Sequence, residues 1–154
     1  MAIAMARGAL AMLGAGFLLL VVVVAPEADE ASLVGVWETP EAKSNVEVYQ
    51  CGVALCGRII SLKEPLDEDG NDKLDRRNKD ESMHSRPVVG IEILTGFVAD
   101  GPGKWSGGRI YNPEDGKTYK CKLTLRDDGT LKVRGYVGLS IFGKTQIWRR
   151  LARA

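Results

Sequence analysis

The sequence is poor in the residues that most often build catalytic and metal sites. It holds one histidine, His84, and three cysteines, and it contains no Gly-x-Ser-x-Gly motif of the kind that presents a hydrolase nucleophile. A hydrolytic triad needs a base beside a nucleophile, and zinc needs several histidine or cysteine ligands. We therefore predict no catalytic residue, no metal ligand and no cofactor, and we interpret His84 as a solvated loop residue. An enzyme would need polar groups that converge inside the fold, such as Arg109 or Tyr136.

The chain also has little net charge, with 21 basic and 20 acidic residues. Without the first 31 residues, 20 basic and 17 acidic residues remain. Nucleic-acid-binding proteins usually concentrate basic residues in a patch or stripe. Here the lysines and arginines are scattered along several segments, so we predict a solvated surface and no nucleic-acid partner.

One long apolar run is present, over residues 9–25, and it follows Arg7. A cation, an apolar stretch and small residues at its end are typical of a secretory signal peptide. The run is slightly shorter than the about 20 residues that span a bilayer. We interpret residues 1–31 as a signal peptide whose cleavage site the sequence does not define. The alternative is a retained anchor, which would be the chain's one contact with a membrane. Residues 32–154 would form a single domain that is periplasmic or secreted.

Beyond the leader, apolar and polar residues alternate between turn residues, and no segment shows a convincing helical period. We expect strands near residues 34–38, 46–51, 55–62, 88–98, 104–111, 117–125, 131–137 and 144–151. Consecutive hairpins leave exposed edges unless the sheet closes. The sequence therefore predicts an all-β fold, an eight-stranded antiparallel up-and-down barrel. An immunoglobulin-like sandwich would need long crossovers, whereas most connections here are short.

Two local patterns suggest ligands that we do not expect. The long polar loop over residues 63–87 contains an acidic run at 67–72, but its glycine and closing residue do not match an EF-hand. Residues 138–145 match the P-loop pattern, which requires a following helix to hold phosphate. A strand-like segment follows instead, so we predict a hairpin there and no nucleotide. Long polar loops are often functional, and we place this one near the barrel mouth.

Two of the three cysteines are close in the sequence. Cys51 and Cys56 would face each other across a hairpin with a four-residue loop, near enough for a disulfide. In an oxidising compartment we predict that they pair. Two free thiols are the alternative if the chain stays in the cytoplasm. Cys121 lies on an alternating apolar face and is expected to be a buried, inert thiol.

The two ends of the strand set carry a known pattern. Gly35-Val36-Trp37 and Trp148-Arg149-Arg150 resemble the lipocalin and calycin signature, in which an arginine packs across the tryptophan and closes the base of the barrel. The resemblance assigns structural roles to Trp37 and Arg149. A guanidinium stacked on an indole contributes about 0.5–2 kcal/mol.

A closer resemblance covers nearly the whole mature chain. The chain is similar to the bacterial family called domain of unknown function 2147 at residues 46–49, 51, 55–59, 86–87, 105, 107–113, 116–119, 134–136 and 146–148. That resemblance implies a small secreted protein with a lipocalin-like barrel and no established activity. The long loop departs from the family, which tends to show Asn-Pro-Asp where this chain has Asn78-Lys79-Asp80.

Alternation identifies the side chains that should point into the barrel. These are Val48, Ile91, Ile93, Trp105, Tyr119, Leu123, Leu131 and Val133. Such residues either line a lumen that binds a small, mostly apolar ligand or simply fill the core. We expect non-catalytic ligand binding. The alternative is a cell-envelope protein with a filled core that binds another macromolecule through its strands and long loop.

Overall fold

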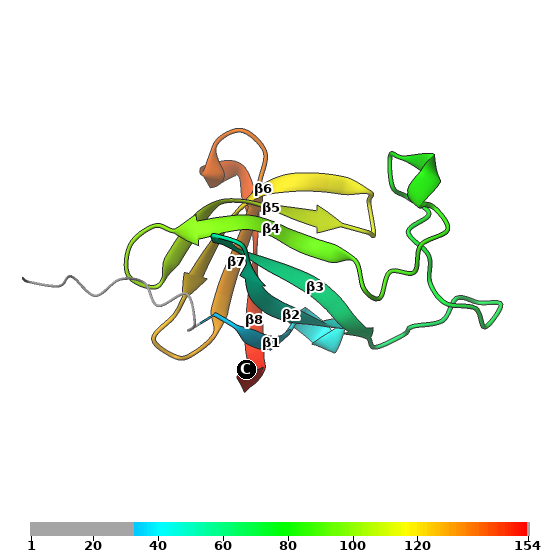
Figure 1. Ribbon diagram of the computed structural model, residues 1–154, viewed down its shortest axis with the longest axis horizontal. Coiled ribbons are helices and arrows are strands. Elements are labelled where there is room, and N and C mark those ends of the chain that lie inside the picture. Colours follow the sequence, from blue (N-terminus) through cyan, green and yellow to red (C-terminus); the bar gives the residue numbers. More distant parts are fainter. Residues whose placement is uncertain (1–32, 154) are drawn as a thin grey trace, which may run out of the picture.

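The computed structural model describes residues 33–153, in which eight strands form a closed barrel (Figure 1). The predicted leader over residues 1–31 lies outside the described residues. The strands are β1 (Gly35–Glu38), β2 (Ser44–Cys51), β3 (Ala54–Leu62), β4 (Glu92–Ala99), β5 (Lys104–Asn112), β6 (Lys117–Leu125), β7 (Leu131–Tyr136) and β8 (Gly143–Arg153). Three single-turn 3-10 helices lie in the connections, η2 (Pro40–Ala42), η3 (Glu81–Met83) and η4 (Ser140–Phe142). None of the helices described is long and apolar enough to cross a membrane.

Each strand pairs antiparallel with the next, and β1 also pairs with β8. The last pairing closes the sheet, so that neither the first nor the last strand is left as an exposed edge. The predicted all-β barrel is therefore confirmed, and the sandwich alternative is excluded. The expected strand near residues 88–98 begins later, at Glu92, because residues 88–91 belong to the long connection.

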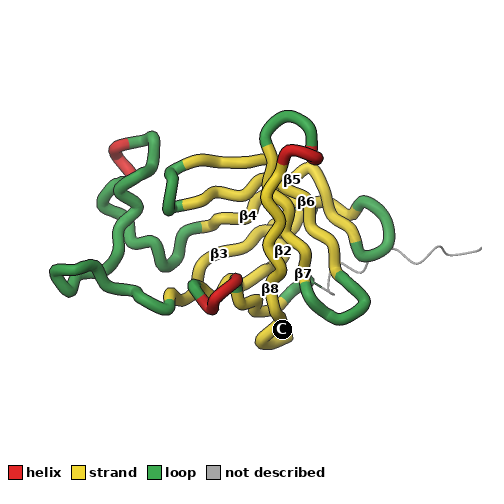
Figure 2. Tube along the Cα trace, turned by 180° about the vertical axis from the view of Figure 1, so that it is seen from behind, coloured by secondary structure: helices red, strands yellow, loops and turns green. Residues whose placement is uncertain are grey.

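The up-and-down order divides the connections between two ends. The β1–β2, β3–β4, β5–β6 and β7–β8 connections belong to one end, which we call the open end. The β2–β3, β4–β5 and β6–β7 turns belong to the other, the closed end. Figure 2 shows the long β3–β4 connection projecting on the side away from the β4–β5 and β6–β7 turns.

The interior towards the closed end is packed with large apolar side chains. All three tryptophans, Trp37, Trp105 and Trp148, are at most 1% exposed. Gly108 allows close packing there, since a Cβ at this position would lie 2.5 Å from the ring of Phe97. Burying each large apolar side chain contributes roughly 1.5–3 kcal/mol. This packed region is the main hydrophobic core of the barrel.

An arginine covers Trp37 as the lipocalin resemblance implies, but it is not the predicted one. The guanidinium carbon of Arg150 lies 4.1 Å from the centroid of the Trp37 ring. Arg150 also donates to the Val34 carbonyl at 3.2 Å. The assignment of Arg149 was wrong, because a register shift in β1 places Trp37 opposite Arg150. Arg149 instead forms an ion pair with Glu38, the next residue of β1.

The predicted disulfide between Cys51 and Cys56 is present, with the two Cα atoms 5.8 Å apart. The hairpin turn is tighter than expected, because Cys51 pairs with Ala54 across Gly52 and Val53. The bond therefore runs diagonally from β2 to β3. Cys121 is free and buried, and burial raises the pKa of its thiol to about 12. A thiol that stays protonated at neutral pH is a poor nucleophile.

Candidate functional site

A large cavity of about 1330 Å³ opens at the open end of the barrel. Its walls come from the barrel interior and from all four connections at that end. The long connection contributes residues between Lys63 and Val88, and the end of β5 with the turn after it contributes Asn112 to Asp115. The barrel is thus solid towards one end and hollow towards the other.

The chemistry of the cavity changes from its interior to its rim. The apolar lining consists of Ile59, Leu62, Leu74, Val88, Ile93, Ile110, Val133, Val137, Phe142 and Trp148. The charged lining consists of Glu41, Lys43, Lys63, Glu64, Asp67, Lys73, Arg76, Arg77, Glu114, Asp115 and Lys144. Six basic and five acidic residues nearly balance, so the rim does not select strongly for one sign of charge. This pattern suits a molecule with an apolar body and a polar end.

Hydrogen bonds fix several polar groups of the cavity wall, two of them on its inner strands. The Tyr119 hydroxyl donates to the Asp115 carboxylate at 2.5 Å, and this bond raises the pKa of Tyr119. Burial disfavours the charged form of Asp115, but hydrogen bonds from Tyr119 and the Lys117 amide outweigh it and lower the pKa. Deeper in the barrel, the Trp148 indole donates to the Gln146 side chain at 2.8 Å. These bonds orient polar atoms without bringing a nucleophile and a base together.

The predicted lumen residues divide between the cavity and the packed core. Ile93, Tyr119 and Val133 line the cavity. The other five are buried away from it, namely Val48, Ile91, Trp105, Leu123 and Leu131. Ligand contact by any of the eight stays a prediction.

Several lining residues were not among those predicted. Ile110 and Trp148 lie on the inner face, and alternation within β8 alone does not decide whether Trp148 or the opposite face, with Ile147 and Leu151, points inward. The exposed fractions of the two side chains, 38% for Ile147 and 1% for Trp148, show that Trp148 points inward. Pairing β8 with β7 would have identified Trp148 as an inward-facing residue. Its partner across the two strands is Leu131, which is fully buried.

One buried charge helps to fasten the long connection to the barrel. Asp75 is fully buried and accepts hydrogen bonds from Tyr111 at 2.5 Å, Arg86 at 2.8 Å and Asn78 at 2.9 Å. Burial opposes ionisation of Asp75, but these bonds outweigh it, and the pKa of Asp75 lies below its usual value. Next to this group, the connection passes close over the β5–β6 turn. A Cβ on Gly116 would lie 1.6 Å from the backbone oxygen of Arg77.

Beneath this connection, outside the barrel, lies a second hollow of about 480 Å³. His84, the single histidine, belongs to the same connection, and its Nε2 lies 2.7 Å from the Asn78 carbonyl oxygen. His84 lines neither cavity. Within residues 33–153, no group of histidine, cysteine and acidic side chains is arranged to hold a metal ion. The P-loop pattern falls on the β7–β8 connection and the start of β8, so a strand follows it.

Residues 35–150 match a protein family described as "Uncharacterized protein conserved in bacteria (DUF2147)". The chain belongs to this family. Among solved structures, this DUF2147 chain is similar to a Helicobacter pylori protein, HP1028, described as belonging to the lipocalin family. The TM-score is 0.67 and the identity 29%, over 78% of this chain and 83% of the other. No curated protein matches the chain. The resemblance to DUF2147 and to lipocalins is thereby confirmed.

Proposed function

We propose that this protein binds a small, mostly apolar molecule in the barrel without transforming it. The observation that carries the proposal is the cavity of about 1330 Å³, whose inner walls are apolar and whose rim is charged. Ligand pockets in proteins commonly have volumes of about 300–1,000 Å³, and this cavity is larger because it extends from the apolar barrel interior to the charged rim. The ligand's apolar part would lie against Ile110, Val133 and Trp148, with its polar end at the rim.

The lipocalin-family neighbour supports binding as the role of such a barrel. The polar groups of the cavity wall support the same reading, because the pairs that line it, Tyr119 with Asp115 and Trp148 with Gln146, satisfy each other. A hydrolase would need a base beside a nucleophile in this wall.

We further propose that the mature protein works in the periplasm or outside the cell. The disulfide between Cys51 and Cys56 supports an oxidising compartment, and so does the signal-like sequence at residues 1–31. Fractionation of the host, with the mass of the recovered protein, tests this proposal. A cytoplasmic protein that keeps its first residues and has reduced cysteines would contradict it.

Native mass spectrometry of protein purified from its host tests ligand binding directly. We expect an additional mass that disappears when the protein is denatured. A Gly135→Leu variant sharpens the test, because Gly135 lines the cavity and a Cβ there would make ordinary contacts, 3.4 Å from Ile110 and 3.7 Å from Tyr119. The larger side chain should occupy the lumen and remove the adduct while the barrel remains folded.

Ser106→Leu is the matched control, since Ser106 lies on β5 and does not line the cavity. This variant should keep the adduct at the wild-type level. A lumen that is empty in the wild-type protein, or an adduct that Gly135→Leu leaves unchanged, contradicts binding in the barrel.

A further inference from the structure

The β7–β8 connection displays an unusual group of apolar side chains. Val137, Leu139, Ile141 and Phe142 are between 67% and 74% exposed, all within six consecutive residues. We call residues 137–142 the apolar loop. Large apolar side chains clustered on a surface commonly mark a site of interaction with a protein or a membrane. Val137 and Phe142 also line the mouth of the cavity, so the loop forms part of the open end.

The apolar loop is held in position by an arginine of β7. Arg134 donates to the Ser140 carbonyl at 2.7 Å, to the Ile141 carbonyl at 3.0 Å and to the Thr145 hydroxyl at 2.7 Å. The Phe142 amide donates to the Leu139 carbonyl at 3.1 Å, which closes the turn of η4. These bonds satisfy backbone groups that would otherwise be costly to move into an apolar medium. The carbonyls of Leu139, Ser140 and Ile141 therefore keep a partner inside the protein when the loop enters such a medium.

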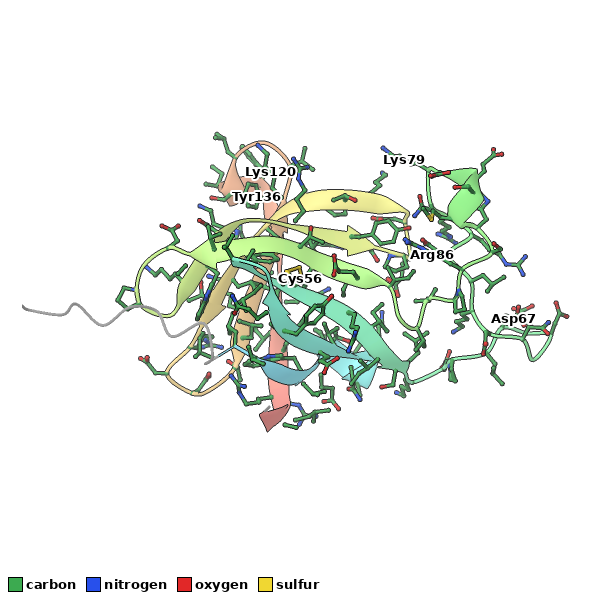
Figure 3. All side chains as sticks on the ribbon, in the orientation of Figure 1. Cys56, Asp67, Lys79, Arg86, Lys120 and Tyr136 are labelled. Atoms are coloured by element: carbon green, nitrogen blue, oxygen red, sulfur yellow. A yellow bond between two sulfur atoms is a disulfide. The ribbon has the colours of Figure 1, made fainter. Side chains whose placement is uncertain are left out.

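Uncompensated positive charge lies beside the apolar loop. No acidic residue follows Asp128 in the sequence, so neither β7, β8 nor the loop between them carries a negative side chain. Lys120 and Lys122 of β6 and Lys144 of β8 are exposed, and Lys120 pairs in register with Tyr136, the last residue of β7. Figure 3 shows Lys120 and Tyr136 at the base of this loop. Within the described part of the chain, none of the three lysines forms an ion pair.

Apolar side chains flanked by lysines fit the surface of an anionic lipid bilayer. The apolar groups can enter the boundary between headgroups and acyl chains, while the lysines contact the phosphates. A nucleic acid would use the lysines and leave the four apolar side chains in water. We propose that the apolar loop inserts into an anionic membrane surface, with Lys120, Lys122 and Lys144 against the headgroups. The sequence had predicted membrane contact through an uncleaved leader alone.

Docking in this way would bring the mouth of the cavity to the bilayer. If the protein binds a ligand in its barrel, as proposed above, that ligand could then pass between lipid and lumen without crossing water. This consequence rests on the proposed function, whereas the docking itself does not, because Leu139 and Ile141 lie outside the cavity lining.

An Ile141→Trp variant tests the docking. The three native tryptophans are buried, so the added indole is the one that lipid can reach. The protein is purified from its host and mixed with phosphatidylglycerol vesicles whose acyl chains are brominated. We expect the fluorescence of the added indole to fall by about half or more, since bromine quenches indoles that enter the apolar region.

Val53→Trp is the matched control, because Val53 is 90% exposed and lies in the β2–β3 turn at the closed end. Its indole should not be quenched. A retained leader would be common to both variants and would not account for a difference between them. No quenching at position 141, or equal quenching at the two positions, overturns the proposal.

The charge requirement is tested with Lys120→Gln and Lys122→Gln together. Each basic residue near an anionic surface contributes about fivefold to partitioning, so the double variant should bind phosphatidylglycerol vesicles about 25-fold more weakly. Lys104→Gln with Lys132→Gln removes the same charge from exposed positions of β5 and β7 at the closed end, and this control should stay within about threefold of wild type. Equal binding to phosphatidylcholine vesicles contradicts the role of the lysines.

Two other partners give distinguishable results, and either would overturn the proposal. A dimer in sedimentation that Ile141→Ser with Phe142→Ser converts to monomer, without vesicle binding, would make the loop an interface between two copies. Binding to a polyanionic oligonucleotide that the same serine variant leaves unchanged, again without vesicle binding, would assign the lysines to nucleic acid. An empty lumen would contradict the proposed function and leave the quenching at position 141 unaffected.

Discussion

At the scale of single residues, the hydrogen bond between Tyr111 and Asp75 shows how the long connection is attached to the barrel. Tyr111 lies on β5 and its hydroxyl donates to the buried carboxylate of Asp75, 36 residues earlier in the chain. Arg86 completes the group, with its guanidinium carbon 5.8 Å from the centroid of the Tyr111 ring. Nothing in the alternation of β5 indicates this contact, because the partners are distant in sequence and Asp75 lies in a polar loop.

This pairing predicts a specific alkaline titration. Burial and the hydrogen bond to Asp75 raise the pKa of Tyr111 from 10.0 to about 12. Because the folded pKa is the higher one, the contact stabilises the fold fully below pH 10 and is lost as the pH rises towards 12. The difference in ultraviolet absorbance between wild type and Tyr111→Phe should show one tyrosine that ionises near pH 12. A difference curve centred at pH 10 would show that Tyr111 does not contact Asp75 in solution.

At the scale of elements, the strands and the presence of the long connection could be predicted, but the path of that connection could not. Alternation and turn residues give the eight strands because period-two burial is a local property of each segment. The arginine over Trp37 is Arg150 and not the predicted Arg149, and this shows the limit of reasoning from single strands. A one-residue register shift between β1 and β8 decides which side chain contacts Trp37. The long connection is held partly by the buried carboxylate of Asp75, which composition does not distinguish from the exposed acids around it.

The long connection should detach from the barrel when Asp75 is replaced. Asp75→Ala leaves Tyr111, Arg86 and Asn78 without their shared acceptor. Removing one partner from a buried charged group typically costs about 3–5 kcal/mol. We expect trypsin to cleave near Arg76 and Arg77 at least about tenfold faster than in wild type, while circular dichroism of the barrel is retained. Asp69→Ala is the control in the same connection, because Asp69 is exposed. Unchanged cleavage in Asp75→Ala would refute the anchor.

At the scale of the whole molecule, the barrel is asymmetric along its axis. Inward-facing residues could be predicted from alternation, but which of them fill the core and which border a cavity could not. Trp105 and Leu123 pair in β5 and β6 near the closed end, whereas Ile110 and Tyr119 pair in the same two strands beside the cavity. The difference depends on how side chains from all eight strands meet across the barrel, and no single strand contains that information.

Closure of the barrel at β1 and β8 predicts unequal roles for two adjacent arginines. Arg150 lies on the ring of Trp37 and binds the Val34 carbonyl, whereas the Arg149 side chain is 71% exposed and pairs with Glu38. An arginine stacked on a buried indole contributes about 1–2 kcal/mol, and an exposed ion pair contributes about 0–1 kcal/mol. Arg150→Ala should therefore lower the free energy of unfolding in urea by about 2 kcal/mol, and Arg149→Ala by less than about 1 kcal/mol.

The two variants remove the same charge from neighbouring positions of one strand, so they differ chiefly in the contact with Trp37. Fluorescence provides a second measurement, because loss of the guanidinium should give water access to an indole that is fully buried in wild type. Acrylamide should then quench Arg150→Ala more strongly than Arg149→Ala. Equal destabilisation with equal quenching would mean that the β1–β8 seam is held by its backbone pairing alone, and that the arginine over Trp37 does not close this barrel.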